Sequence, residues 1–341
     1  MGPRAWRVQA ILIARFDGDT RTLQAAAPRL MTTPVPPHRV GDPRDQFDAW
    51  REQVRDRLEV TIGTSCVPDP LRDAIRYGST APKASRWRAL LVMQVAHALG
   101  RDSDAALTAA TAVEALHCAT LSIDDLPSMD DAAERRGLPA LHRRFNEAMA
   151  IQASLWLLGS SRTLMASAAA CAGAHADVVS GLAALQQRTE DELQLGQFMD
   201  MMGMLGKAEV DVERLARLKC GRLFALAAQA AAWLPPASGH GGGGERAAIT
   251  AALDLFGEEV GLAYQILDDL EDVREDSSSA GWSARGETGR PTVVARFGVA
   301  AAKSMVDDCI ARAGGALAPL ASVGIDTAPL LHIARSMLDR A

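Results

Sequence analysis

Two clusters of aspartates are the residues of this sequence best suited to do chemistry. The first cluster lies within residues 124–131 and the second within residues 268–272. Each follows an apolar segment, and carboxylates at the end of a buried helix are costly to keep ionised unless cations meet them. Oxygen ligands suit hard cations, and Mg²⁺ is usually shared between a few carboxylates and substrate phosphates. The two clusters therefore predict a magnesium site that acts on a phosphorylated substrate.

The spacing inside each cluster predicts how its carboxylates are presented. Asp268 and Asp272 are four residues apart, so they project from one face of a helix. Pro127 interrupts the first cluster, and we expect Asp130 and Asp131 to return toward its start from a loop. A lone acidic run is more often a solvated loop. The magnesium interpretation therefore depends on what accompanies the two clusters.

Basic residues flank the first cluster on both sides. Arg135 and Arg136 follow it, and Arg86 and Arg88 precede it in an otherwise apolar stretch. Arginine forms bidentate contacts with phosphate groups. In isolation Arg135 and Arg136 would be interpreted as surface charge paired with Glu134. Beside the aspartates, they instead favour a diphosphate site.

With these motifs the chain resembles the trans-isoprenyl diphosphate synthases, or polyprenyl synthetases, from about residue 72 to residue 298. The family's first motif, DDxx(xx)D followed by RRG, is matched by Asp124, Asp125, Asp130, Arg135, Arg136 and Gly137. Its second motif, DDxxD after an aromatic-Gln pair, is matched by Tyr264, Gln265, Asp268, Asp269 and Asp272. Residues 196–200 resemble the family's GQxxD, and residues 219–224 resemble its KTGxLF. Four landmarks in the family's order make the resemblance specific.

The resemblance implies a role for each matched residue. The ligands of Mg²⁺, three ions in the family, would be Asp124, Asp125, Asp130, Asp268, Asp269 and Asp272. Arg135, Lys219 and Gln265 would hold the allylic diphosphate and the developing cation. The isopentenyl diphosphate would meet Arg88, His117 and Arg136, and Arg290 would contact a diphosphate from the segment after the second motif. Without the resemblance, His117 would be interpreted as a core histidine.

Several basic residues of the family are missing here. Ser85 takes the place of the lysine that binds isopentenyl diphosphate, and Leu138 and Ala284 replace two further lysines. Lys83, two residues before Ser85, is a possible substitute. These departures keep open a terpene cyclase or lyase of the same fold, which ionises a prenyl diphosphate without isopentenyl diphosphate. A non-catalytic partner subunit and a purely structural helical protein rank lower, because both acidic motifs are kept.

In this family, bulky aromatic residues at the fourth and fifth positions before the first motif stop chain growth early. Here these positions are Thr120 and Ala119, which leave the cavity open. Leu116 and Val113, one and two turns deeper, are the next candidate floor. The resemblance thus predicts a product longer than farnesyl diphosphate, namely the C20 geranylgeranyl diphosphate.

The rest of the sequence predicts an all-α protein. It is 48% hydrophobic but only 4% aromatic, which is typical of an Ala/Leu-rich helical domain. Helical periodicity predicts helices near residues 46–62, 69–78, 84–99, 103–122, 139–157, 160–173, 176–203, 208–233, 245–272 and 290–314. We expect residues 46–341 to form one large bundle around a central cavity, of the isoprenoid synthase type, and residues 1–45 to be a poorly ordered extension. Almost nothing is predicted as strand.

Charge and cysteine usage narrow the partners and the setting. A net charge of −6 argues against nucleic acid as a partner. No uncharged apolar stretch reaches the roughly 18–20 residues that span a bilayer, and no signal-peptide pattern is seen. The five cysteines are odd in number and scattered, so we expect them to be reduced and mostly buried. We expect a soluble, cytoplasmic protein, and the resemblance implies a homodimer.

Overall fold

The computed structural model describes residues 43–101, 103–204, 206, 209–235, 243–278 and 291–338, and these residues form the predicted helical protein. The first half contains α3 (Pro43–Gly63), α4 (Asp69–Ser79), α5 (Trp87–Ala98), α6 (Asp104–Asp124), α7 (Leu141–Arg144), α8 (Glu147–Cys171) and α9 (Ala176–Met204). The second half contains α10 (Val212–Ala216), a π-helical turn (Arg217–Gly221), α11 (Arg222–Trp233), α12 (Gly243–Ser278), α13 (Val293–Phe297), α14 (Val299–Ala316), α15 (Ala318–Ser322) and α16 (Ala328–Leu338). The two short strands described are β1 (Glu134–Arg135) and β2 (Leu138–Pro139), which pair antiparallel.

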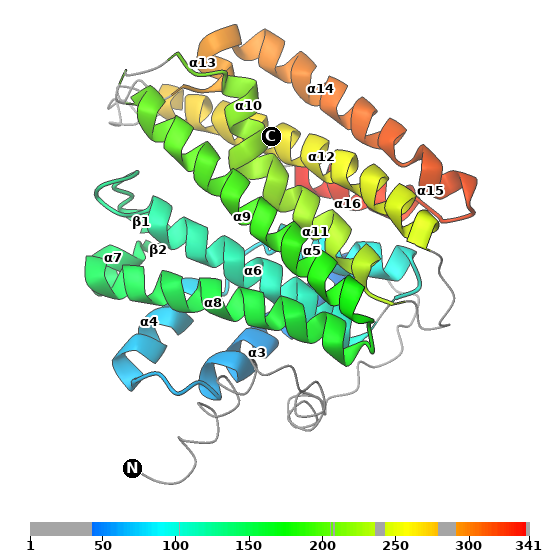
Figure 1. Cartoon of the computed structure of the whole chain (residues 1–341). Coiled ribbons are helices and arrows are strands. Elements are labelled where there is room, and N and C mark those ends of the chain that lie inside the picture. The colour runs from blue at the N-terminus through cyan, green and yellow to red at the C-terminus, as the bar shows by residue number, and fades with distance from the viewer. Residues whose placement is uncertain are drawn as a thin grey trace, which may run out of the picture.

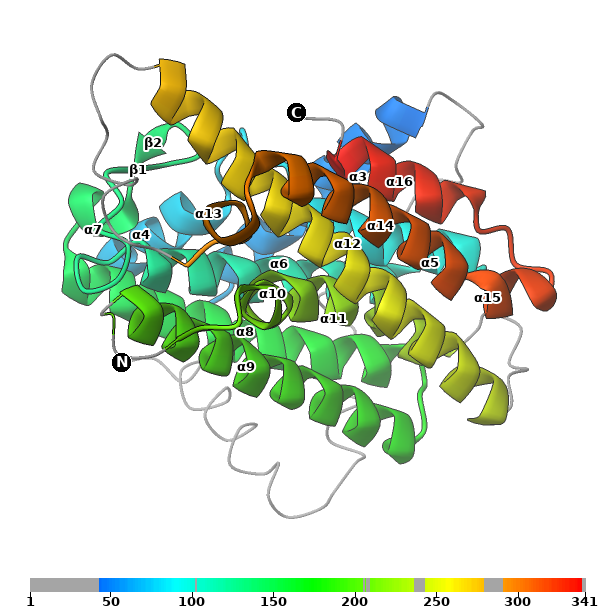
Figure 2. The ribbon, with the colours of Figure 1, turned by 90° about the horizontal axis from the view of Figure 1, so that it is seen from above.

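The helix α6 lies at the centre of the fold. It packs against α3, α5, α8 and α11, while α12 packs between α11 and α14. Figure 1 shows α6 and α8 in one layer with α9, α11 and α12 above them, and Figure 2 shows α12 and α14 crossing over this arrangement. Most of α6 is alanine, leucine and threonine and is buried on every face, as expected of a helix that is apolar all round. Small side chains let its neighbours approach closely.

By length and composition alone, α6 is apolar enough to cross a membrane, although Glu114 interrupts it, so it is not an uncharged stretch of that length. It is the one such helix among the described residues, and 78% of its most apolar window is buried inside the protein. The helix also carries Glu114, which is fully buried. Both facts identify α6 as a core helix of this fold.

Several predicted helix boundaries were wrong. The segments 139–157 and 160–173 were expected as two helices, but residues 147–171 form the single helix α8. It begins after Asn146, whose side chain accepts a hydrogen bond from the backbone N–H of Met149 at 2.8 Å and so caps the helix. Pro139 belongs to β2 instead of a helix. The predicted helix 208–233 is divided into α10, the π-helical turn and α11.

The cysteine prediction is confirmed for the described chain. All five thiols are free, and Cys118, Cys220 and Cys309 are buried. Burial raises the pKa of the Cys118 thiol to about 11, so it stays protonated at neutral pH. Cys118 and Cys220 both lie beside arginines of the candidate site described next.

Candidate active site

The two aspartate motifs lie at the same end of the bundle. The first begins where α6 ends, and the second lies in the last third of α12. Both views place the C-terminal part of α12 and the β1–β2 hairpin, which follows the first motif, at one end of the molecule (Figures 1 and 2). Helices from opposite halves of the chain therefore bring the two motifs to a common site.

The predicted return of the first motif is confirmed. Helix α6 ends at Asp124, and the backbone N–H of Asp130 donates back to the carbonyl oxygen of Asp124 at 2.9 Å. The N–H of Ala132 likewise donates to the carbonyl of Asp125 at 3.2 Å. The fold-back places Asp130 beside the helix end. Asp131 instead has a left-handed backbone (φ 45°), and its carboxylate accepts from Arg143 at 2.7 Å.

Two motif carboxylates are held in surroundings that disfavour their charge. Burial raises the pKa of Asp124 to about 6, with Asp130 adding to the effect and Lys219 opposing it. Burial likewise raises the pKa of Asp269 to about 6, although Gln265 donates a hydrogen bond to it at 3.0 Å. A carboxylate destabilised in this way gains from a nearby cation.

The donor chemistry of the site fits Mg²⁺. The motifs offer only carboxylate oxygens, which hard cations prefer. Across the described parts of the chain, no three His, Cys, Asp or Glu side chains come close enough to hold a metal ion by themselves. Mg²⁺ in proteins usually takes one or two carboxylates, with waters and substrate phosphates completing its octahedron.

The hairpin after the first motif presents the two predicted arginines. Arg136 and Gly137 both have positive φ angles, 57° and 73°, which is the geometry of a tight two-residue turn between β1 and β2. Such a turn requires glycine or a strained residue, which accounts for the Gly of the RRG motif. Arg135 on β1 donates from Nε to the buried carboxylate of Asp125 at 3.0 Å.

A buried glutamate, which the sequence analysis did not single out, organises the arginines. Glu114 on α6 is fully buried and accepts from Arg86 at 2.8 Å and from Arg136 at 3.5 Å. Arg86 has a left-handed backbone (φ 53°) just before α5 and also donates to the carbonyl of Ser79 at 3.2 Å. The sequence did contain a feature that indicated this role. Glu114 is a lone glutamate inside an apolar helix, one turn from His117, and glutamate is rarely buried without a partner.

Arg88 and His117 meet, as the resemblance implied. The guanidinium of Arg88 lies 3.2 Å from Nε2 of His117 and 4.3 Å from the ring centroid of Phe224. Burial and then the charge of Arg88 hold the pKa of His117 well below its usual range. The imidazole is therefore neutral and can accept a hydrogen bond from Arg88. Arg88 also donates to the Cys220 thiol at 3.3 Å.

Lys219 lies in the middle of the π-helical turn Arg217–Gly221, and its ammonium pairs with Asp200. Such turns inside helices are frequent at functional sites. The GQxxD motif of α9 explains the pairing. A Cβ atom at Gly196 would lie 2.9 Å from the backbone nitrogen of Lys219, so only glycine lets the turn approach. Asp200, one helical turn later, then receives the ammonium.

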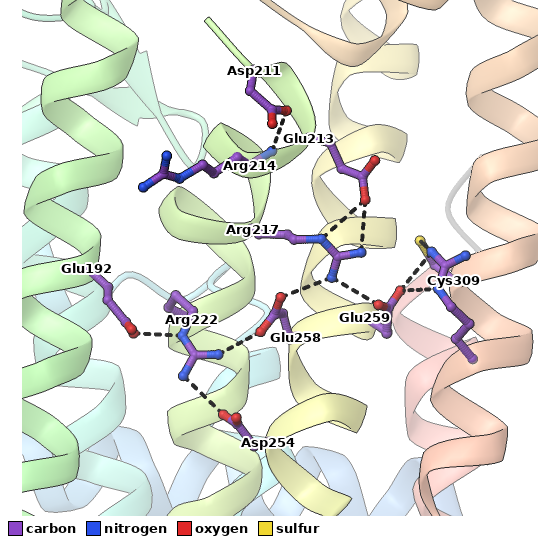
Figure 3. Close-up of polar contacts among 11 residues, drawn as sticks. Glu192, Asp211, Glu213, Arg214, Arg217, Arg222, Asp254, Glu258, Glu259 and Cys309 are labelled. Atoms are coloured by element: carbon purple, nitrogen blue, oxygen red, sulfur yellow. Dashed lines mark hydrogen bonds and ion pairs between the residues drawn. The ribbon is translucent and has the colours of Figure 1, made fainter. Parts of the chain in front are cut away.

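A network of charged residues holds this turn at both ends (Figure 3). Arg217 at its start contacts Glu213 of α10 and Glu258 and Glu259 of α12, each within 3.0 Å. Arg222 just after it contacts Glu192 of α9 and Asp254 and Glu258 of α12, again within 3.0 Å. These pairs tie the segment carrying Lys219 to the helix that carries the second aspartate motif. The sequence analysis did not predict them.

A cavity of about 220 Å³ leads away from the first motif between α6, α8 and α9. Its walls are formed by Leu116, Ala119, Thr120, Ile123, Asp124, Ser154, Leu155, Leu158, Glu190, Leu193, Gln194, Gln197 and Lys219. The three residues predicted to gauge chain length, Leu116, Ala119 and Thr120, are all among them. Val113 is not among these lining residues. Asp124 and Lys219 mark the end of the cavity where a diphosphate would lie.

The structure thus gathers most of the predicted residues. Arg290 and Ala284 lie outside the described residues. Among the predicted site residues that the structure describes, Gln265 lies beside Asp269, and Arg136 lies beside Glu114.

Comparison with known proteins gives the family. Residues 69–313 match the Polyprenyl synthetase family. The chain belongs to the polyprenyl synthetase family. A geranylgeranyl diphosphate synthase of Cereibacter sphaeroides is 33% identical over 283 residues, covering 80% of this chain and 90% of that protein. A farnesyl diphosphate synthase of Escherichia coli K12 is 31% identical over 275 residues, covering 80% and 89%.

The fold of this polyprenyl synthetase also matches solved structures. The crystal structure of a geranyltranstransferase from Thermotoga maritima superposes with a TM-score of 0.70 at 27% identity, covering 87% of this chain and all of that one. By family and relatives, the chain is a trans-isoprenyl diphosphate synthase, a prenyltransferase that joins isopentenyl diphosphate to an allylic diphosphate. The relatives include synthases of different product length.

Proposed function

We propose that this polyprenyl synthetase uses Mg²⁺ to build a trans-polyprenyl diphosphate of 20 carbons. The observation that supports this length is the cavity that starts at Asp124 and Lys219 and runs past Ala119 and Thr120. Neither Ala119 nor Thr120 carries a bulky aromatic ring, so a growing hydrocarbon chain has room to pass.

In the proposed mechanism, positive side chains hold the leaving diphosphate. Bound Mg²⁺, held by the aspartates of the two motifs, supplies charge neutralisation to the diphosphate. Arg135 and Lys219, kept at the mouth by Asp125 and Asp200, stabilise the negative charge that develops as the allylic carbon–oxygen bond breaks. The double bond of isopentenyl diphosphate then attacks the allylic carbon. Transfer of one proton from the resulting cation to the released diphosphate forms the new double bond and completes the added five-carbon unit.

The structure offers basic groups for isopentenyl diphosphate despite Ser85. Arg88 contacts His117 and Arg136 contacts Glu114, and these two residues of α6 are three positions apart, so both arginines lie along the same part of that helix. The ammonium of Lys83 lies 4.0 Å from the place where a Cβ atom at Gly137 would be, so it reaches the hairpin beside Arg136. This supports Lys83 as the replacement for the lysine missing at position 85 and favours a synthase over a cyclase.

We also propose a homodimer built on α8 and α9. These neighbouring helices carry three large apolar side chains that are exposed and lie outside the cavity wall: Ile151, Leu195 and Phe198. Apolar surface gathered on adjacent helices is a feature of interfaces. Light scattering that gives the mass of a single chain at micromolar concentration would contradict this assembly.

Product analysis tests the function. The purified protein with Mg²⁺ is offered labelled isopentenyl diphosphate together with dimethylallyl, geranyl or farnesyl diphosphate, and each allylic diphosphate alone. Labelled C20 diphosphate is expected, and Asp124→Ala and Asp268→Ala should each abolish turnover. Hydrocarbons or alcohols formed from an allylic diphosphate alone, without label, would identify a cyclase or lyase instead. Near wild-type activity in both variants would refute the proposed site.

A further inference from the structure

One residue in the wall of the cavity between α6, α8 and α9, Glu190, belongs to a buried polar network. Ser161 of α8 donates to the carbonyl of Ala112 on α6 at 2.7 Å. Gln186 of α9 donates to Ser161 Oγ at 2.9 Å and to Glu190 Oε1 at 3.0 Å. The Ser161, Gln186 and Glu190 side chains are all buried. These hydrogen bonds connect α6, α8 and α9 at one depth in the bundle, which we call the Ser161–Gln186 level. Glu190 is the member of this network that lines the cavity.

Glu190 brings a charge into the wall of a cavity that must take hydrocarbon. Its two carboxylate oxygens accept from Nε of Arg162 at 3.2 and 2.9 Å, while the arginine side chain remains about half exposed. An ion-paired carboxylate is poorly compatible with an apolar neighbour, because contact with hydrocarbon removes its remaining polar surroundings. A hydrocarbon chain that reaches Glu190 therefore stops there.

The depth of this level follows from helix geometry. On α6, Asp124 at the mouth and Leu116 are eight residues apart, which is about 12 Å along the axis, and Ala112 lies one turn deeper. On α9, Asp200 at the mouth and Glu190 are ten residues apart, or about 15 Å. An isoprene unit contributes four chain bonds of about 1.5 Å in staggered form, or about 5 Å of length. The cavity therefore holds about three units beyond the one attached to the diphosphate.

We propose that Glu190, held by Arg162 and Gln186, is the residue that sets product length in this enzyme. The inference rests on the proposed function, since it presumes that the cavity receives a growing prenyl chain. The limit to chain growth then lies at the carboxylate on α9, whereas the sequence predicted it on α6. Removal of the carboxylate opens the cavity toward the Ser161–Gln186 level and permits a fifth unit.

Glu190→Ala tests the proposal, with Glu190→Gln and Thr189→Ala beside it. Thr189 is a matched control because it is the neighbouring residue of α9, is equally buried, is absent from the cavity wall and bonds only to its own helix at Leu185. Each protein is incubated with Mg²⁺, farnesyl diphosphate and excess labelled isopentenyl diphosphate, and product lengths are measured. Glu190→Ala should raise the ratio of C25 and longer products to C20 at least tenfold. Thr189→Ala should leave the wild-type ratio unchanged.

The outcomes separate this proposal from the proposed function. If the wild-type protein incorporates no label, the synthase function itself fails. If wild type elongates and Glu190→Ala, shown to be folded by circular dichroism, keeps the wild-type product ratio, the role of Glu190 is refuted. Should Glu190→Ala not fold, Glu190→Gln decides, because it keeps the size of the side chain and removes only the charge. It should raise the ratio at least threefold, and an unchanged ratio overturns the proposal.

Discussion

The contact between Gly196 of α9 and the π-helical turn permits a sharp test of how Lys219 is positioned. In Gly196→Ala, the new Cβ atom would lie 2.9 Å from the backbone nitrogen of Lys219 and 3.0 Å from Cβ of Leu218. Ordinary contacts of a Cβ atom begin at 3.4 Å. The turn must therefore move away from α9 by about half an ångström. Because backbone atoms make the contact, no flexible side chain can absorb the change.

Two opposing effects set the expected change in the free energy of unfolding of Gly196→Ala, and the role of Lys219 sets the expected change in kcat/KM. Overpacking costs about 1–3 kcal/mol, whereas alanine is favoured over glycine inside a helix by about 1 kcal/mol. We expect a net loss of about 0–2 kcal/mol in the free energy of unfolding. A charge-assisted contact is worth about 1.5–3 kcal/mol, and displacing Lys219 forfeits much of it in the transition state. This corresponds to a fall in kcat/KM of roughly 10- to 100-fold.

Gly159→Ala is the matched control. Gly159 lies inside α8, and a Cβ atom there would meet nothing within 4 Å. This substitution should stabilise the protein by about 0.5–1 kcal/mol and leave kcat/KM unchanged. The assay is initial-rate kinetics with the allylic diphosphate varied, accompanied by urea unfolding of all three proteins. If Gly196→Ala keeps kcat/KM within twofold of Gly159→Ala, the argument that Gly196 positions Lys219 is refuted.

Two further predictions concern the cavity and the carboxylates. Ala119→Phe places an aromatic ring in the cavity wall and should shorten the product to C15 or C10, as chromatography of the dephosphorylated products would show; an unchanged length would contradict the proposed path of the chain. Burial raises the pKa of Asp124 from 3.8 to about 6, so its contribution to stability without metal is present below about pH 4 and is lost as the pH rises through 6. In EDTA, the Tm of Asp124→Asn should therefore rise relative to wild type between pH 4 and pH 7, and a constant difference would disprove the shift.

The parts of the site that the sequence predicted are those that depend on local spacing. Asp130 returns to Asp124 because Pro127 cannot continue the helix, and that rule needs no tertiary information. The positions of Ala119, Thr120 and Leu116 on one side of α6 likewise follow from helical periodicity. Helix boundaries were less well predicted, because the cap at Asn146 and the continuation of α8 through Gly159 were both missed, although Asn146 is the one residue of N-cap type near that start.

The parts that the sequence did not predict depend on contacts between distant segments. The β1–β2 hairpin is only two residues long on each side, too short for an alternating pattern. The π-helical turn at Lys219 exists where Gly196, Gly221 and Gly261 let three helices approach. A Cβ atom at Gly261 would lie 2.6 Å from the Cα atom of Gly221. Such packing depends on residues more than twenty positions apart. Helical periodicity relates only residues of the same helix, so it cannot predict these contacts.

The location of buried charge links stability to function in this protein. Among the described residues, the buried Asp, Glu, Lys and Arg side chains are Arg86, Arg88, Glu114, Asp125, Glu190, Asp200, Arg222, Glu259 and Asp269. Each belongs to the aspartate motifs, to the arginine pocket, to the network that holds the π-helical turn, or to the floor of the cavity. Buried ion pairs add little stability over well-packed apolar residues, but losing one partner costs about 3–5 kcal/mol.

Stability alone therefore gives no reason for this distribution, whereas positioning does. Glu114 shows the point most directly, because its Oε1 serves both Arg86 and Arg136 while its Oε2 has no hydrogen-bond partner within the described structure. A side chain that served only to stabilise the core would satisfy both oxygens or would be apolar. Glu114 instead holds the guanidinium groups of Arg86 and Arg136 at the edge of the site. The core of this polyprenyl synthetase gives up packing energy there to fix Arg136, the arginine of this pair that the proposed function places against a diphosphate.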